Sequence, residues 1–126
     1  MHKKIVFKRE VVNSILSFCK MHHPNEAILV LRGNNKKDTI FVDSLIIPPM
    51  AVGGPSFTEF LSSMLPSDIS FMGTAHSHPS RNAEPSLTDL NHFLGLVSVI
   101  VRYPYEDDDF FPYNSDGEKL EFSLQD

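Results

Sequence analysis

The feature that most constrains the fold is a set of short apolar runs that are continuous rather than alternating. Residues 27–31 (AILVL) and 97–101 (VSVIV) are apolar, or nearly so, on both faces of an extended chain. Strands with this pattern are covered on both sides of a sheet. Residues 8–22 instead carry apolar side chains at helical spacing, and Pro24 ends that helix. The combination predicts one domain of the α/β (α+β) class over residues 1–126, built on a mixed sheet.

The remaining elements follow from the same patterns and from turn residues. A second helix is expected to begin at Ser86, because apolar residues recur after it at helical spacing. Gly33-Asn34-Asn35 is typical of a turn between two strands. Residues 48–56 resemble an exposed loop, and 57–68 are ambiguous between a strand and a helical turn. Further strands are expected at 3–7, 39–47, 70–78, near 109–113 and at 119–124.

Charge and composition exclude several classes of protein. The net charge is −5, with the basic residues concentrated in 1–37 and the acidic residues in 104–126. A negative chain without a sustained basic stripe argues against nucleic acid as the main partner. No apolar run approaches the roughly 20 residues of a membrane span, so no membrane association is expected. A single cysteine, Cys19, excludes an intramolecular disulfide and a multi-cysteine metal site. We therefore expect a small cytoplasmic protein, with the acidic run 106–109 as a solvated loop.

Two histidines, His76 and His78, stand at the end of a predicted strand. Residues i and i+2 of a strand face the same side, so both imidazoles could reach one metal ion, although packed or surface histidines give the same pattern. Asp89 would complete a His, His, carboxylate set of the kind that holds catalytic zinc. Ser86 and Asp89 are three residues apart at a helix start, which is also a helix-capping pattern. The residues alone leave both interpretations open.

Together these residues match a longer pattern. His76-Ser77-His78-Pro79, six intervening residues and Ser86-x-x-Asp89 resemble the JAMM (MPN+) metalloprotease family, most closely its small stand-alone archaeal members. The family also places a glutamate upstream in a Pro-x-Glu context, which Pro24-Asn25-Glu26 matches. The chain departs from many relatives at 28–29, where Ile-Leu replaces a Cys-Gly pair. That change affects strand packing and removes no ligand.

The resemblance implies a fold, a cofactor and a reaction. The fold would be a mixed, curved sheet flanked by helices, similar to the cytidine deaminase architecture. His76, His78 and Asp89 would hold one Zn²⁺ per chain, Glu26 would act as general base, and Ser86 would face the developing oxyanion. The substrates would be conjugates of ubiquitin-like proteins, cut after the C-terminal glycine. Without the resemblance, Glu84 would be the preferred base, because it is nearer in sequence to the ligands.

Several alternatives and secondary predictions accompany this interpretation. The same zinc chemistry could process the tail of a small sulfur-carrier protein or cleave a dipeptide-like molecule, and a non-catalytic MPN module could serve as a scaffold or bind ubiquitin-like proteins. A nucleobase deaminase is excluded, because its zinc site needs H-x-E and P-C-x-x-C motifs and the chain has a single cysteine. The proposed edge for an extended substrate tail is Phe57, Thr58, Glu59 and Phe60. Cys19 is expected in the core, His22 and His23 at a helix C-terminus, and His92 on the surface.

Overall fold

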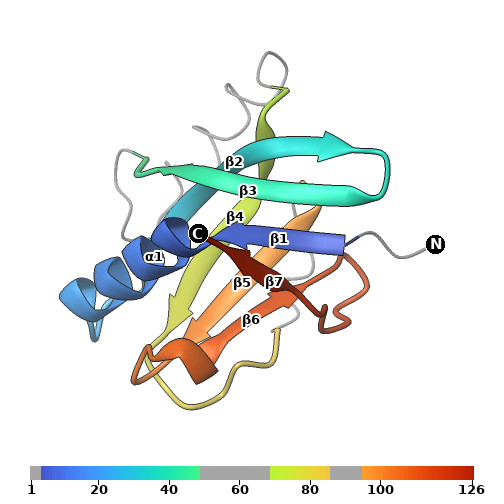
Figure 1. Ribbon diagram of the computed structural model, residues 1–126. Helices are drawn as coiled ribbons and strands as arrows, with labels where there is room; N and C mark the ends of the chain where they lie inside the picture. Colours follow the sequence, from blue (N-terminus) through green and yellow to red (C-terminus); the bar gives the residue numbers. More distant parts are fainter. Residues whose placement is uncertain (1–3, 49–68, 86–94) are drawn as a thin grey trace.

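The computed structural model describes residues 4–48, 69–85 and 95–126, and in this part of the chain a curled sheet carries one helix (Figure 1). The seven strands lie in the order β6-β5-β4-β2-β3-β1-β7. Its elements are β1 (Lys4–Lys8), α1 (Arg9–His22), β2 (Ile28–Lys36), β3 (Thr39–Ile46), β4 (Phe71–His78), β5 (Val97–Arg102), the 3-10 turn η2 (Asp107–Asp109), β6 (Phe110–Tyr113) and β7 (Ser123–Gln125). The predicted strands and the first helix are confirmed to within a few residues.

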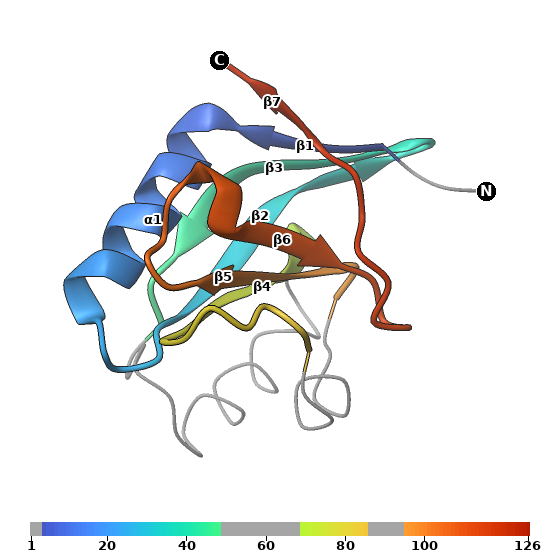
Figure 2. The same ribbon diagram turned by 90° about the horizontal axis from the view of Figure 1, so that it is seen from below.

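The sheet is mixed, as the sequence predicts. β1 runs parallel to β3 and β7, and β4 runs parallel to β5, whereas β2 is antiparallel to β3 and β4. The sheet also curls (Figure 2), so that aromatic side chains from strands far apart in its order come into contact. The ring of Phe7 on β1 lies 5.1 Å from that of Phe110 on β6 and 5.5 Å from that of Phe122, centroid to centroid. Both contacts are edge-to-face, the geometry that aromatic quadrupoles favour.

The core forms between α1 and the sheet. The apolar positions predicted for this helix are its buried ones: Val11, Val12, Ile15, Leu16 and Cys19. They pack in one cluster with side chains from β1 to β5, including Phe7, Leu29, Leu31 and Val99. The strand predicted from the run at 27–31 is buried as expected, with Leu29, Val30 and Leu31 almost inaccessible to solvent. β2 is accordingly an interior strand of the sheet, between β4 and β3.

The turn predicted at Gly33-Asn34-Asn35 is wrong. These three residues continue β2, and the turn lies at 37–38, where Lys37 adopts a positive φ of 42°. Gly33 is instead the point where the register against β3 shifts. A Cβ atom at Gly33 would lie 1.7 Å from the carbonyl oxygen of Phe41. The glycine is there to let two backbones approach each other across a bulge, a role it shares with many glycines inside strands.

The acidic run 106–109 is only partly the solvated loop that the sequence predicts. Asp109 is buried, and its carboxylate accepts hydrogen bonds from Arg102 Nε at 2.7 Å and from the Glu106 amide at 2.9 Å. Arg9 and Lys20, both on α1, pair with Asp107 and Glu106 at 3.3 and 3.2 Å. Side chains on β5 and α1 therefore hold this loop in place.

Some predictions fall on residues outside the described ranges. The second helix, expected from Ser86 onward, is one of them, and so is the proposed substrate edge at 57–60. Within the ranges that the structure does describe, no helix has the length and apolar character needed to cross a membrane.

Candidate metal centre

β4 brings the two candidate ligands of the HSH sequence together. His76 and His78 lie on the same face of this strand, half-buried, with ring centroids 5.1 Å apart. Between them, Ser77 points to the opposite face and is fully buried. β4 itself is a central strand, paired with β2 on one side and β5 on the other. Two imidazoles thus lie side by side on a central strand of the sheet.

The hydrogen bond of His78 determines which of its ring nitrogens can bind a metal. Its Nδ1 lies 3.0 Å from the backbone carbonyl oxygen of Asn82. A carbonyl only accepts, so Nδ1 carries the proton and donates it. In the neutral ring the lone pair is then on Nε2. A metal-binding histidine is commonly oriented by such a bond from its other nitrogen, which fixes both the tautomer and the ring plane.

The loop 79–85 that supplies this carbonyl is itself anchored. The Tyr103 amide donates to the carbonyl oxygens of His78 and Ser80, at 3.0 and 2.9 Å. The hydroxyl of Tyr113, on β6, donates to the Ala83 carbonyl at 2.7 Å. The loop therefore crosses β5 and reaches β6 within five residues of His78. A backbone carbonyl has no sequence signal, so the sequence could not have indicated the part that residue 82 plays.

Glu26 lies two residues before β2, the strand that pairs with β4 on the side away from β5. The β2–β4 register pairs Ile28 with His76, and the Ser77 amide donates to the Ala27 carbonyl at 3.0 Å. Side chains alternate along an extended chain, so Glu26 is expected on the face of Ile28 and of the two imidazoles. Its side chain is exposed and so accessible to water.

Glu84, the base that the residues alone would have favoured, is placed differently. It follows Ala83, whose carbonyl is bound to β6. The neighbouring Tyr113 has a raised pKa, first because of burial and second because of the Glu84 charge. Glu84 therefore lies near the Tyr113 side chain of β6. The choice of Glu26 over Glu84 as the general base stays a prediction from the family resemblance.

The imidazole pair fits the zinc that the family resemblance implies. Two imidazoles on one strand face, with Nε2 of His78 assigned as a lone-pair atom, are side chains of the kind that zinc prefers. His76 Nε2 is shielded from solvent. Ser86 and Asp89 lie outside the described ranges, and in those ranges no three His, Cys, Asp or Glu side chains gather as a metal cluster. Of the three expected zinc ligands, the described residues therefore include two, His76 and His78.

The other candidate residues have structural contacts. His23 caps the end of α1, and its Nδ1 lies 2.7 Å from the hydroxyl of Tyr105, which is buried. Its ring also lies 4.7 Å from that of Tyr103, centroid to centroid.

Cys19 is buried in the core, and burial raises the pKa of its thiol to about 12 despite an opposing hydrogen bond with Ser77. The thiol is therefore protonated at neutral pH and is no nucleophile.

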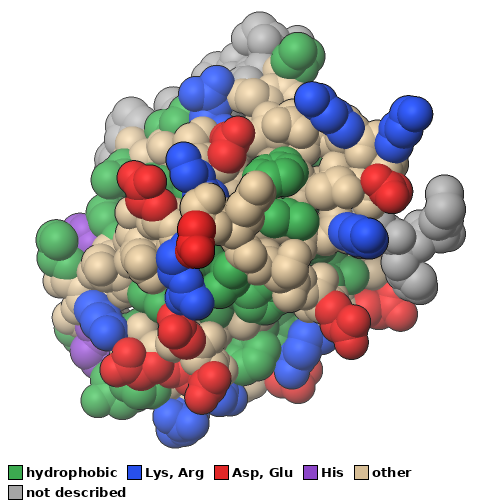
Figure 3. Space-filling view, in the orientation of Figure 1, with side chains coloured by type: hydrophobic (Ala, Val, Ile, Leu, Met, Phe, Trp, Pro, Cys, Tyr) green, Lys and Arg blue, Asp and Glu red, His purple; other side chains and the backbone are tan. Residues whose placement is uncertain are grey.

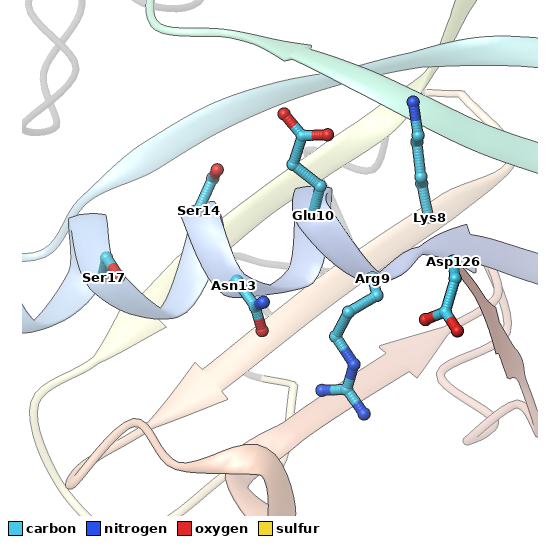
Figure 4. Close-up of a pocket in the computed structure, with 7 residues that line it drawn as sticks. All are labelled: Lys8, Arg9, Glu10, Asn13, Ser14, Ser17 and Asp126. Carbon is cyan, nitrogen blue, oxygen red and sulfur yellow. The ribbon is translucent and has the colours of Figure 1, made fainter.

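A hollow of about 460 Å³ lies away from the imidazole pair, on the exposed side of α1 (Figure 4). It is lined by Lys8, Arg9, Glu10, Asn13, Ser14, Ser17 and Asp126. Figure 4 shows these side chains diverging from one another, with Arg9 and Glu10 pointing to opposite sides of the helix. On the face of the molecule in Figure 3, basic and acidic side chains are mixed and histidine is visible only at the left margin. Nothing in this hollow converges on a reacting group.

Comparison with known proteins identifies the class. The chain matches, over residues 8–112, the family described as prokaryotic homologs of the JAB domain. It therefore belongs to that family, whose wider class is the JAMM/MPN metalloprotease-like proteins. A protein of Haloferax volcanii, named as a probable metalloprotease, is 32% identical over 111 residues, which cover 82% of this chain and 69% of the relative.

Solved structures agree with the class and with the fold. A JAB1/MPN domain protein from Archaeoglobus fulgidus superposes with a TM-score of 0.73 at 32% identity, covering 98% of this chain and 99% of that one. A structure described as a metalloprotease-like zinc site in the proteasome and signalosome gives 0.70 at 32% identity, with both chains fully covered. A Desulfitobacterium hafniense protein, 20% identical with a TM-score of 0.70 over 97% and 93% of the two chains, shares the fold. The JAMM/MPN resemblance and the α/β fold class predicted from the sequence are confirmed.

Proposed function

We propose that this metalloprotease-family chain is a zinc-dependent isopeptidase or peptidase that hydrolyses the bond after the C-terminal glycine of ubiquitin-like modifier proteins. The observation that carries the proposal is the imidazole pair of His76 and His78, which share a face of β4 at a centroid distance of 5.1 Å. Asp89 would complete the ligand set. Zinc held there supplies a Lewis acid that polarises the scissile carbonyl and makes water more acidic.

The chain's own residues then divide the proton transfers. Glu26 is exposed to solvent, and in this proposal its carboxylate accepts a proton from the attacking water. It returns that proton to the departing amine, which cannot leave as an anion. The hydroxyl of Ser86 donates to the oxygen on which negative charge develops. No covalent enzyme intermediate is needed, which agrees with the inert thiol of Cys19.

The proposed substrate class follows from the demands of such a site. An extended tail can dock by adding a strand to a sheet edge, and Phe57–Phe60 is the edge that we propose for it. A tail that ends in glycine lets the scissile carbonyl approach the metal closely, since no side chain stands beside it.

The test combines a substrate panel with two matched glutamate variants. Ubiquitin-like proteins joined through their C-terminal glycine to a lysine side chain, or to a linear peptide, are incubated with the zinc-loaded chain, with and without a chelator. We expect cleavage that the chelator abolishes and that added zinc restores. Glu26→Gln should keep zinc and bind the uncut conjugate but lose cleavage, whereas Glu84→Gln should remain active.

Three outcomes would contradict the proposal. Cleavage that persists without metal would remove zinc from the reaction. An active Glu26→Gln variant beside an inactive Glu84→Gln variant would show that the base is misassigned. Wild-type protein that holds zinc and binds conjugates, but cuts none of the panel, would establish a binding module in place of an enzyme.

A further inference from the structure

The hydroxyl of Ser77, the residue between the two histidines, accepts a hydrogen bond from β2 that in a regular sheet would go to a backbone carbonyl. In an antiparallel pair, two facing residues of the hydrogen-bonded kind exchange two backbone hydrogen bonds. Ser77 and Ala27 make one of them, from the Ser77 amide to the Ala27 carbonyl at 3.0 Å. The second bond goes from the Ala27 amide to the Ser77 side-chain oxygen, at 2.8 Å. The hydroxyl has taken the place of a backbone carbonyl.

The hydroxyl replaces the carbonyl at the end of the β2–β4 ladder, just before the first residue of β2. The β2–β4 ladder begins with the pair Ile28 and His76, so Ala27 is the next residue outward and Glu26 the one after it. The two bonds between Ser77 and Ala27 are therefore the outermost described ties between β2 and β4 at this end of the sheet. Both partners are almost inaccessible to solvent, at 0% and 1% exposure, whereas Glu26 is exposed.

The Ser77 side chain also reaches α1, because it hydrogen-bonds with Cys19. The buried Ser77 hydroxyl thus links β4, which carries the two imidazoles, both to Cys19 on α1 and to Ala27, the residue that follows Glu26. A hydrogen bond to a buried amide is costly to lose, since the amide then has no partner. The chain at 26–27 would shift to find one.

We propose that Ser77 is a positioning residue that holds the Glu26 carboxylate in place relative to His76 and His78. The inference rests on the proposed function only for the role of Glu26 as the base. Ser77 touches no reacting atom and acts through the backbone of Ala27. Its removal should therefore lower the rate of the proton-transfer step and leave the metal ligands and substrate binding as they are.

The experiment compares three serine variants in the zinc-loaded full chain. Ser77→Ala removes the acceptor, Ser77→Thr keeps a hydroxyl, and Ser98→Ala is the control, a buried serine on β5 that does not neighbour β2. Because small displacements of a catalytic group cost up to about 10²-fold, we expect Ser77→Ala to lower kcat by about 10–100-fold. KM and zinc content should stay unchanged, Ser77→Thr should recover most of the rate, and Ser98→Ala should match wild type.

A double variant separates positioning from a general loss of structure. If Ser77 acts through Glu26, Ser77→Ala should cost less than about two-fold when it is added to Glu26→Gln, measured in single turnover with excess enzyme. An equal loss in both backgrounds would overturn the proposal. So would a folded Ser77→Ala variant whose kcat equals that of Ser98→Ala.

Two measurements test the role of Ser77 without an activity assay. Hydrogen exchange of the Ala27 amide should be slow in wild type, and a fast rate there would refute the contact even if Ser77→Ala failed to fold. A crystal structure of Ser77→Ala should show Glu26 displaced from the imidazole pair, and an unmoved Glu26 would overturn the inference. By contrast, wild-type protein that cleaves no conjugate while holding this contact would count against the proposed function alone.

Discussion

Replacing Asp109 by asparagine should destabilise the fold by an amount that the structure allows us to work out. The buried carboxylate accepts one bond from Arg102 Nε at 2.7 Å and one from the Glu106 amide at 2.9 Å. A hydrogen bond involving a charged group contributes about 1.5–3 kcal/mol, and an ordinary one about 1 kcal/mol. Asparagine keeps one acceptor oxygen, but its NH₂ group would face one of the two donors. Because the Arg102 side chain is 26% exposed, we expect a net loss near the lower end, about 2–3 kcal/mol.

The pH dependence gives the prediction its sign. Burial acts to raise the pKa of Asp109, but the bonds from Arg102 and from the Glu106 amide outweigh it and leave the pKa below its usual value. A carboxyl whose pKa is lower in the folded state contributes stability above the unfolded pKa of about 4, and that stability is lost as the pH falls through the folded-state pKa. The gap between wild type and Asp109→Asn should therefore be full at pH 7 and narrow below about pH 4.

Urea and thermal unfolding at pH 7 and at about pH 3 measure this gap, with Asp107→Asn as the matched control. Asp107 is exposed and pairs with Arg9 at 3.3 Å, so its loss should cost less than about 1 kcal/mol. For a chain of this length, a loss of 2–3 kcal/mol corresponds to a fall in Tm of about 10 °C. If the two variants are equally stable at pH 7, or if the Asp109→Asn gap is the same at both pH values, the argument is wrong.

The other predictions concern the site and its supports. His76→Ala should lose the zinc that wild type holds at about one ion per chain, measured by metal analysis after gel filtration, and retained tight zinc would show that the ligand is misassigned. Cys19→Ser should keep kcat within about two-fold, since the protonated thiol is no nucleophile, and native protein should resist alkylation; inactive but folded Cys19→Ser would revive a thiol mechanism. Tyr113→Phe removes the donor to the Ala83 carbonyl, so we expect about 1 kcal/mol less stability in urea and weaker zinc binding in a chelator competition; unchanged zinc affinity would show that the loop needs no such anchor.

Local pattern explains why much of this fold was predictable. The run at 27–31 became a strand buried on both faces, and the apolar positions of α1 became its buried side, because side-chain periodicity alone decides which residues can leave water. The HSH sequence likewise places two imidazoles on one face, since residues i and i+2 of any strand share a side. These properties depend on neighbours in the sequence and on nothing further away.

Other features depend on which strands become neighbours, and only the tertiary structure decided them. Gly33 was predicted in a turn because glycine favours turns, but the carbonyl of Phe41 on the adjacent strand requires it inside β2. Asp109 was predicted in solvent with the rest of its acidic run, but Arg102 approaches it from β5 and makes burial favourable. In each case the deciding partner is supplied by another strand.

The candidate site divides in the same way. Sequence alone determined that His76 and His78 could act together, because their spacing is a local property of a strand. It could not determine the tautomer of His78, which a backbone carbonyl sets, nor choose between Glu26 and Glu84 without a family resemblance. The register of β2 on β4 pairs Ile28, two residues after Glu26, with His76, and the Tyr113 hydroxyl ties Ala83, the residue before Glu84, to β6. Strand order and register are properties of the whole sheet, and no stretch of sequence encodes them by itself.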